Sequence, residues 1–131
     1  MSNSTDRYLF RGMRVDTKEW VYGFYKSFYN HHAERCHIID NPDKTQTDLV
    51  IPETIGQFTG LTDKYGWKIF EQDKIKRSNG DIGTVKWSNQ YGCWDVFFKS
   101  SVDYNRPLSQ VISDSEIIGS VHDINQGETN K

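Results

Sequence analysis

Three observations predict a mainly β fold with little helix for this sequence. Between residues 53 and 77, three short runs of aromatic and β-branched residues are separated by turn residues at 63–66 and 71–73. Asn79-Gly80 lies between two further runs of this kind, and both residues tolerate the positive φ of a type I′ hairpin turn. No apolar stripe of helical period reaches the length of a helix anywhere in the chain.

The same patterns place strands along the whole chain, bounded by glycine, proline and polar turn residues. The expected strands span residues 8–11, 20–29, 36–39, 49–51, 57–59, 67–70, 74–77, 82–87, 93–99 and 116–121. Gly66 is expected to close a type I turn followed by a bulge, because glycine reaches positive φ without steric cost. Residues 40–46 are the expected mobile loop, and residues 109–115 are expected to form a short helix or a loop.

The run at residues 20–29 is apolar on both faces of the strand that it predicts. One face carries the larger set, Trp20, Tyr22, Phe24 and Phe28. The opposite face carries Val21, Tyr25 and Tyr29. A strand that is apolar on both faces is covered on both, by a second layer or by a partner chain. We therefore expect Val21, Tyr25 and Tyr29 to form a partner interface.

Length and composition predict one domain with a single core. The chain has 131 residues, and aromatic residues make up 14% of it against a hydrophobic share of only 35%, so a mainly aromatic core is expected. Residues 1–6 and 125–131 are polar and are expected to be disordered tails. Cys36 and Cys93 are expected to be free thiols, and the lack of a signal sequence or long apolar run predicts a soluble, cytoplasmic protein.

Several motifs along the chain occur together in a known family. They are F-R-G-x-R-x-D at residues 10–16, E-W-V-Y-G at 19–23, the whole stretch 53–77, G-x-V-x-W at 83–87 and E-I-I-G-S-V at 116–121. In this order they resemble the YopX family of phage and prophage proteins. The sequence departs from the family at Gln72, where the family has glycine, so the turn before residues 74–77 is expected to be less tight.

The resemblance implies a mainly β fold that contains an SH3-like barrel. The barrel is expected over about residues 56–121, with an additional N-terminal strand layer over about residues 7–52. A strand at residues 116–121 can close such a barrel. The resemblance also implies a bacterial or phage origin and an unassigned biochemical function. It transfers no catalytic residues and no cofactor to this chain.

Two groups of side chains are candidates for metal binding or catalysis. His31, His32, Cys36 and His37 include zinc-ligand types, but a structural zinc site wants four ligands, and remote Cys93 or His122 would have to complete it. A solvated polar loop is the favoured interpretation, with no metal. The carboxylates Asp16, Glu19, Glu53, Glu71 and Asp73 could pair as acid and base, yet no pattern shows that two converge. Asp73 fits a turn residue that accepts backbone hydrogen bonds.

Basic residues concentrate between residues 64 and 87. The six are Lys64, Lys68, Lys74, Lys76, Arg77 and Lys86, against Glu71, Asp73 and Asp81, whereas residues 40–63 are net acidic. Lys74 and Lys76 point to one side of their expected strand, so a basic stripe beside exposed aromatics could track a phosphate backbone. The favoured interpretation is a solvated lysine face that guards a sheet edge, because the local basic excess is small for the electrostatics that nucleic-acid binding needs.

These observations favour a non-enzymatic accessory or interaction protein that self-associates. The two-sided aromatic strand and the acidic and basic segments offer complementary surfaces for a partner. The alternative is a nucleic-acid-binding module that uses the basic face of residues 64–87. An enzyme is the third hypothesis and has no proposed catalytic residue.

Overall fold

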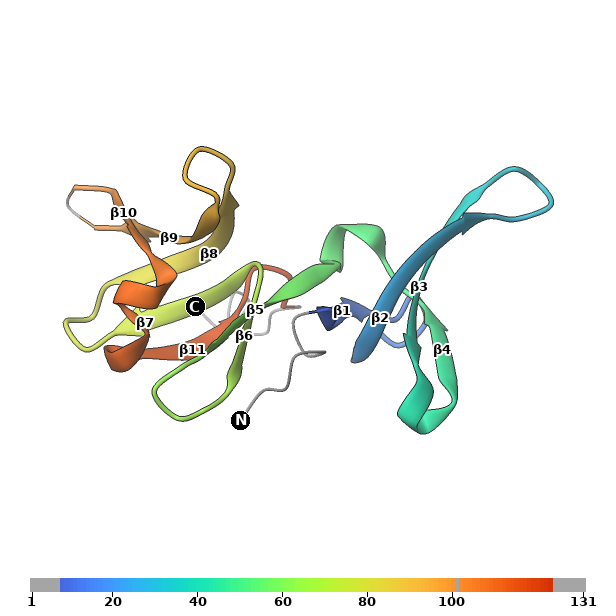
Figure 1. The fold of residues 1–131 in the computed structure, drawn as a ribbon, viewed down its shortest axis with the longest axis horizontal. Coiled ribbons are helices and arrows are strands. Elements are labelled where there is room, and N and C mark those ends of the chain that lie inside the picture. The colour runs from blue at the N-terminus through green and yellow to red at the C-terminus, as the bar shows by residue number, and fades with distance from the viewer. Residues whose placement is uncertain (1–7, 101, 124–131) are drawn as a thin grey trace. The chain divides into compact units, whose positions relative to one another are not determined.

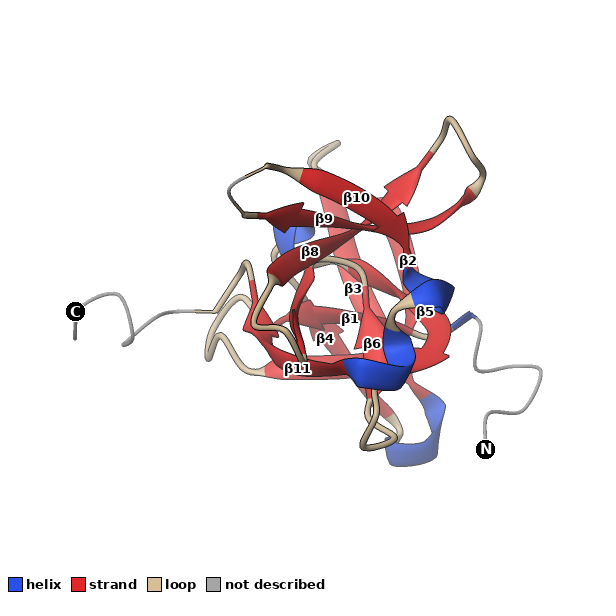
Figure 2. Cartoon of the chain, turned by 90° about the vertical axis from the view of Figure 1, so that its left-hand side faces the viewer, coloured by secondary structure: helices blue, strands red, loops and turns tan. Residues whose placement is uncertain are grey.

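A computed structural model describes residues 8–100 and 102–123 of the protein. Strands dominate this part of the chain (Figures 1 and 2). The strands are β1 Phe10–Met13, β2 Trp20–Tyr29, β3 Arg35–Asn41, β4 Gln46–Leu49, β5 Gly56–Thr62, β6 Lys68–Phe70, β7 Asp73–Arg77, β8 Ile82–Ser88, β9 Cys93–Lys99, β10 Tyr104–Pro107 and β11 Ser115–Ser120. The mainly β prediction is confirmed. The expected tails, residues 1–6 and 125–131, lie outside the described residues.

The described strands form two antiparallel sheets. One has six strands in the order β4-β3-β2-β1-β5-β6, and the other has five in the order β10-β9-β8-β7-β11. Both sheets are open, because their edge strands do not pair with each other in the described part of the chain. The SH3-like barrel and the additional N-terminal strand layer are therefore not confirmed. The chain divides into two compact units, residues 1–60 and 61–131, and the boundary falls inside β5.

The first unit is built around the long strand β2. Its first residues pair with β1, and the residues from Phe24 onward pair with β3. Gly23 permits the close approach of β2 and β3, since a Cβ at this position would lie 2.3 Å from the backbone oxygen of Asp40. The buried apolar residues of this unit are Met13, Ile39, Val50 and Phe58.

The connection from β3 to β4 is shorter than the loop expected at residues 40–46. β3 continues to Asn41, whose side-chain oxygen accepts hydrogen bonds from the backbone amides of Asp43 and Lys44 and caps a 3-10 helix at Pro42–Lys44. β4 then begins at Gln46. The strand expected at residues 49–51 is also misplaced, because β4 ends at Leu49 and Val50 makes only an isolated bridge to Arg14.

The second unit contains the predicted meander from β7 to β9. The hairpin at Asn79-Gly80 is confirmed, but its expected turn type is wrong. Only Gly80 has positive φ, and the amide of Gly80 donates to the backbone oxygen of Arg77 over 2.9 Å. The Asn79 side chain accepts from the Asp81 amide instead, which favours negative φ at Asn79. Gly66 closes its hairpin in the same way, so the type I turn and bulge predicted there are confirmed.

The core of the second unit is mainly aliphatic, so the expected aromatic core is wrong. Its buried residues are Ile69, Ile75, Val85, Val96, Phe98, Leu108 and Val111. Many aromatic side chains of this unit are exposed instead, among them Tyr65, Trp67 and Tyr91. β10 was not predicted, and the helix or loop expected at residues 109–115 consists of two 3-10 helices, Leu108–Gln110 and Ile112–Asp114.

The turn at Gln72 keeps the conformation that glycine would adopt. Gln72 has φ +72°, its amide donates to the backbone oxygen of Val85 over 2.8 Å, and its own oxygen accepts from the amide of Val121 over 3.0 Å. These two hydrogen bonds fix the turn, so the expected loosening does not occur. A residue with a Cβ is strained in this conformation.

Replacing Gln72 with glycine is predicted to stabilise the protein. Glycine removes the steric cost of positive φ. This gain outweighs the free-energy cost of the greater conformational entropy of the unfolded chain, so we expect a gain of about 0.5 kcal/mol in the free energy of unfolding. Urea denaturation measures it. Gln72→Ala is the matched control, because alanine keeps the strained Cβ. Equal stability of the two variants would contradict the interpretation.

Candidate binding surfaces

Backbone amides are hydrogen-bond donors to two buried carboxylates of the second unit, Asp63 and Asp73. Asp63 is 5% exposed and accepts hydrogen bonds from the backbone amides of Tyr65, Trp67 and Ile117 over 2.9 to 3.0 Å. Asp73 is also buried and accepts from the Phe70 amide over 2.8 Å. This confirms that Asp73 accepts backbone hydrogen bonds, although the donor precedes it in the chain. Both carboxylates hold turns in place.

The carboxylate of Asp63 is predicted to be essential for stability. Asp63→Ala leaves three backbone amides without their acceptor in a buried turn, and we expect a loss of roughly 3 kcal/mol in the free energy of unfolding. Chemical denaturation tests this against Asp123→Ala, which removes a carboxylate that accepts from the single amide of Ser120. A loss at Asp63 no larger than that at Asp123 would contradict the role assigned to it.

The other candidate carboxylates are less buried than Asp73, and three of them lie in the first unit. Asp16 is exposed and forms an ion pair with Arg14 over 2.9 Å. The hydrogen bond from Arg14 holds the pKa of Asp16 below its ordinary value. Glu19 and Glu53 are exposed residues of the first unit, whereas Glu71 is half-buried in the second unit.

The histidines and Cys36 lie around the β2–β3 hairpin but do not gather at one point. The Nδ1 atom of His37 lies 2.7 Å from the hydroxyl of Tyr25, and the two rings are stacked. Cys36 is the neighbour of His37 on β3 and therefore points to the opposite face of the sheet. The rings of His31 and His32 lie 4.1 Å apart in the turn. Within residues 8–100 and 102–123 no group of three or more potential ligands is suited to a metal ion.

The larger exposed aromatic surface of β2 lies on the face opposite to Val21, Tyr25 and Tyr29. Antiparallel register places Phe24 beside Asp40, Lys26 beside Ile38, and Phe28 beside Cys36, so these side chains share one face with Tyr22. Ile38 in turn pairs with Leu49 on β4. We call this surface the outer aromatic face; its exposed apolar residues are Tyr22, Phe24, Phe28 and Leu49.

The residues predicted as a partner interface occupy the other face of β2. Val21 and Tyr25 are half-buried there, and Tyr25 contacts Phe10 as well as His37. Tyr29 is 65% exposed and lies under the guanidinium of Arg35, whose carbon is 5.4 Å from the ring centroid. Sequence periodicity identified the two apolar faces but could not indicate which one the fold covers.

The end of the β2–β3 hairpin extends beyond the neighbouring strands. β1 pairs with β2 only as far as Gly23, and β4 pairs with β3 only at Ile38–Asn41. Figure 1 shows the two strands continuing together past β4 to their turn. We call residues 24–40 the β2–β3 arm. At the distal end of the arm, β2 and β3 pair only with each other in the described part of the chain.

Three of the six predicted basic residues come together on the solvent-facing side of the five-stranded sheet. Lys74 and Lys76 alternate with the buried Ile75 on β7, and the register of β8 places Lys86 on the same side. Lys99 of β9 joins them, because it pairs with Ile82, which in turn pairs with Lys76. Phe97 lies among these lysines and is 43% exposed. We call this surface the lysine face.

The other three basic residues do not belong to the lysine face. Arg77 alternates with Lys76, so it points to the core side, where it forms an ion pair with Asp114 over 3.4 Å. Lys64 lies in the β5–β6 turn with its ammonium 5.2 Å from the ring centroid of Tyr65. Lys68 is exposed on β6, a strand of the other sheet.

The ion pair of Arg77 predicts a pH-dependent contribution to stability. Hydrogen bonds from Ser78, followed by the charge of Arg77, hold the pKa of Asp114 below its ordinary value of 3.8. This stabilisation is complete above that value and is lost as the pH falls through the lowered pKa of the folded state. Asp114→Asn is expected to reduce the free energy of unfolding by about 1 kcal/mol at neutral pH.

The difference between wild type and Asp114→Asn should therefore shrink as the pH falls below 3.8. Urea denaturation over a pH series measures this difference. Asp103→Asn is the control, because its partner Lys99 is 88% exposed and their ion pair contributes little. A difference at Asp114 that stays constant across the series would contradict the assignment.

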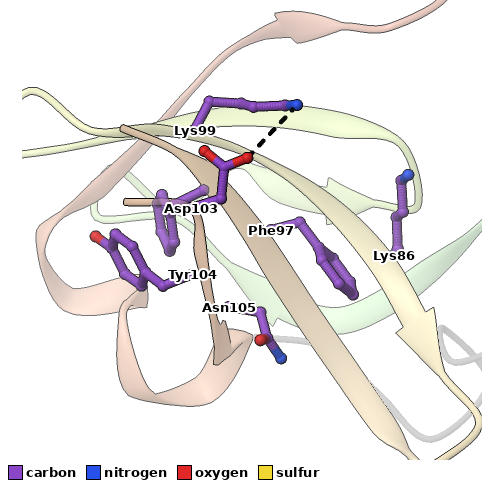
Figure 3. A pocket seen from close by; sticks show the side chains of 7 residues that line it. Lys86, Phe97, Lys99, Asp103, Tyr104 and Asn105 are labelled. Atoms are coloured by element: carbon purple, nitrogen blue, oxygen red, sulfur yellow. Dashed lines mark ion pairs between the residues drawn. The ribbon is translucent and has the colours of Figure 1, made fainter. Parts of the chain in front are cut away.

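A hollow of about 310 Å³ adjoins the lysine face (Figure 3). Its lining includes Lys86, Phe97, Lys99, Asp103, Tyr104 and Asn105, from strands β8, β9 and β10 and the β9–β10 connection. The ammonium of Lys86 lies 5.7 Å from the ring centroid of Phe97. Asn105 donates to the buried carboxylate of Asp95 over 2.7 Å, which fixes the amide beside the hollow. The sequence missed this site because β10 carries no alternating apolar pattern.

Comparison with known proteins identifies the family. The family model described as YopX protein matches residues 9–125, so the chain belongs to the YopX family. This result confirms the resemblance seen in the motifs. No curated protein matches the chain. In the described part of the structure, no helix has the length and apolar character needed to span a membrane.

Proposed function

We propose that this protein is a non-enzymatic, phage- or prophage-encoded accessory protein that self-associates through the outer aromatic face. The observation that carries the proposal is the exposure of Phe24 and Phe28 on one face of an arm whose distal end pairs with no third strand in the described ladder. A bacterial host cell and its cytoplasm are the setting that we infer from membership of the YopX family.

The apolar surface of the arm supports a protein partner. Tyr22, Phe24 and Phe28 are each 40 to 42% exposed and lie on one side of β2, and Leu49 extends the surface across the sheet. Aromatic residues dominate the energetics of protein interfaces, and contiguous exposed apolar patches mark such interfaces. Exposed aromatic residues occur elsewhere in the chain, but here three of them share one face of a single strand.

The pairing of the arm also supports a partner. A two-stranded ribbon is only marginally stable by itself in water, and the distal part of the arm has no third strand along most of its length. Unpaired strand edges offer backbone donors and acceptors to another chain. Covering the arm with protein therefore stabilises both its face and its edges.

A second copy of the chain is the partner that the charges favour. Lys26 and Asp40 both lie on the outer aromatic face, on adjacent strands. In a twofold interface each patch meets its own copy, so Lys26 of one chain can meet Asp40 of the other. Such pairing fixes the orientation, while the aromatic residues supply most of the binding energy.

Light scattering coupled to size-exclusion chromatography tests the proposal. The wild type is expected to elute with a mass that is a multiple of 15.3 kDa, and a Phe24→Ser, Phe28→Ser double variant is expected to elute as a monomer. Tyr91→Ser is the matched control, because Tyr91 is an exposed aromatic residue in a turn of the second unit. Circular dichroism establishes that each variant is folded.

A monomeric wild type at concentrations up to about 100 μM would overturn the proposal, because even a weak dimer is populated there. Association that persists in the folded double variant would also overturn it. Charge exchange gives a second test. Lys26→Asp alone should weaken association, and Lys26→Asp combined with Asp40→Lys should restore it.

A further inference from the structure

We propose that the lysine face and the adjoining hollow bind single-stranded nucleic acid, a function separate from self-association. In this proposal a base stacks on Phe97, and phosphates of the flanking nucleotides contact Lys86 and Lys99, with Lys74 and Lys76 continuing the phosphate path. The combination of an exposed aromatic ring with surrounding cations is the chemistry that single-stranded nucleic acid requires.

Cross-strand register places the four lysines around Phe97. Lys76, Ile82 and Lys99 form one row across β7, β8 and β9, and Lys74, Thr84 and Phe97 form the next row. Lys86 lies two residues beyond Thr84 on β8, in the row that follows. Neighbouring strands lie about 4.8 Å apart, so the lysines surround the ring at distances that adjacent phosphates can bridge.

The hollow provides space for a base beside the ring. Its volume of about 310 Å³ lies at the lower end of the range for small-ligand sites. Figure 3 shows Phe97 between Lys86 on one side and the Lys99–Asp103 pair on the other, with Asn105 below the ring. The Asn105 amide is oriented by Asp95, and its carbonyl oxygen can accept a hydrogen bond from the edge of a base.

The acidic residues near the lysine face leave the cations available. Asp95 pairs in register with Lys86, but its carboxylate is buried and accepts a hydrogen bond from Asn105. Asp103 lies 3.8 Å from Lys99, but both side chains are largely exposed, so this ion pair is weak and a phosphate can replace it. Glu116 pairs in register with Lys76 at the far side of the sheet, which makes Lys76 the weakest of the four contacts.

The geometry favours a single strand over a duplex. The aromatic ring can contribute only when a base is unstacked from its neighbours, which a duplex does not offer without deformation. Four lysines on one sheet face also supply too few phosphate contacts for tight duplex binding at physiological salt.

Fluorescence anisotropy with labelled oligothymidylate and oligouridylate of about 20 nucleotides tests the proposal over salt concentrations from about 50 to 200 mM. The full chain is expected to bind, and its affinity should fall steeply as the salt concentration rises. The two oligonucleotides distinguish DNA from RNA as the ligand. Binding of either one supports the proposal, and no binding of either at the lowest salt concentration overturns it.

Substitutions locate the site. Lys86→Gln combined with Lys99→Gln should lower the slope of log affinity against log salt by about 1.4, since each phosphate contact to a single strand contributes about 0.7. Lys64→Gln combined with Lys68→Gln, which removes the same charge outside the lysine face, is the matched control and should have little effect. If the control lowers this slope as much as the Lys86, Lys99 variant does, the assigned surface is overturned.

The stacking contact has its own test. Phe97→Ala should weaken binding about tenfold, and Phe97→Tyr should retain it, because tyrosine also stacks. Tyr91→Ala is the aromatic control outside the site. Thermal unfolding establishes that Phe97→Ala is folded, and wild-type affinity in that folded variant would overturn the role of the ring. The monomeric arm variant should bind as well as wild type, which separates this inference from the proposed self-association.

Discussion

The second unit depends on the three hydrogen bonds that the carboxylate of Asp63 accepts. Two come from its own turn and one comes from Ile117, 54 residues further along the chain. The neighbouring Lys64 amide donates to the backbone oxygen of Ser115 over 3.0 Å and strengthens the same connection. These contacts hold β11 in place, and β11 pairs with β7 along its length. Lys74 and Lys76 alternate with buried residues on β7. The contacts that hold β11 against β7 therefore also fix the side of the sheet on which these lysines lie.

Local sequence patterns were sufficient to predict the class of fold and the hairpins. The turn glycines Gly66 and Gly80 both reach positive φ, and the strands on either side alternate as expected. The type of the second turn could not be predicted, because it depends on a hydrogen bond that the Asn79 side chain accepts from the Asp81 amide. Gln72 shows the opposite case, in which two backbone hydrogen bonds retain a conformation that its side chain disfavours.

The candidate surfaces were harder to predict because they depend on which face of a strand the fold covers. Periodicity separates Tyr22, Phe24 and Phe28 from Val21, Tyr25 and Tyr29, but both sets are apolar. Burial is decided by contacts such as that between Tyr25 and Phe10, which the sequence does not reveal. In the same way, the charge cluster at residues 64–87 included Arg77, which points to the core side, and omitted Lys99, which the register of β8 and β9 adds.

The two proposals assign separate roles to the two units. The first unit carries an outer aromatic face on which Lys26 and Asp40 lie on adjacent strands, which suits a second copy of the same surface. The second unit carries four lysines and an exposed ring on a sheet that its own turn contacts hold rigidly, which suits a flexible polyanion. Neither surface uses the carboxylates of Asp63 and Asp73, because backbone amides already occupy them.

Hydrogen–deuterium exchange at a series of protein concentrations tests the central claim, that a second copy covers the β2–β3 arm. If the claim is correct, amides of residues 24–40 exchange slowly at high concentration and much faster on dilution, while amides of the second-unit core remain equally protected. Exchange in the arm that does not change with concentration would show that the arm is stable without a second copy, and would contradict the account.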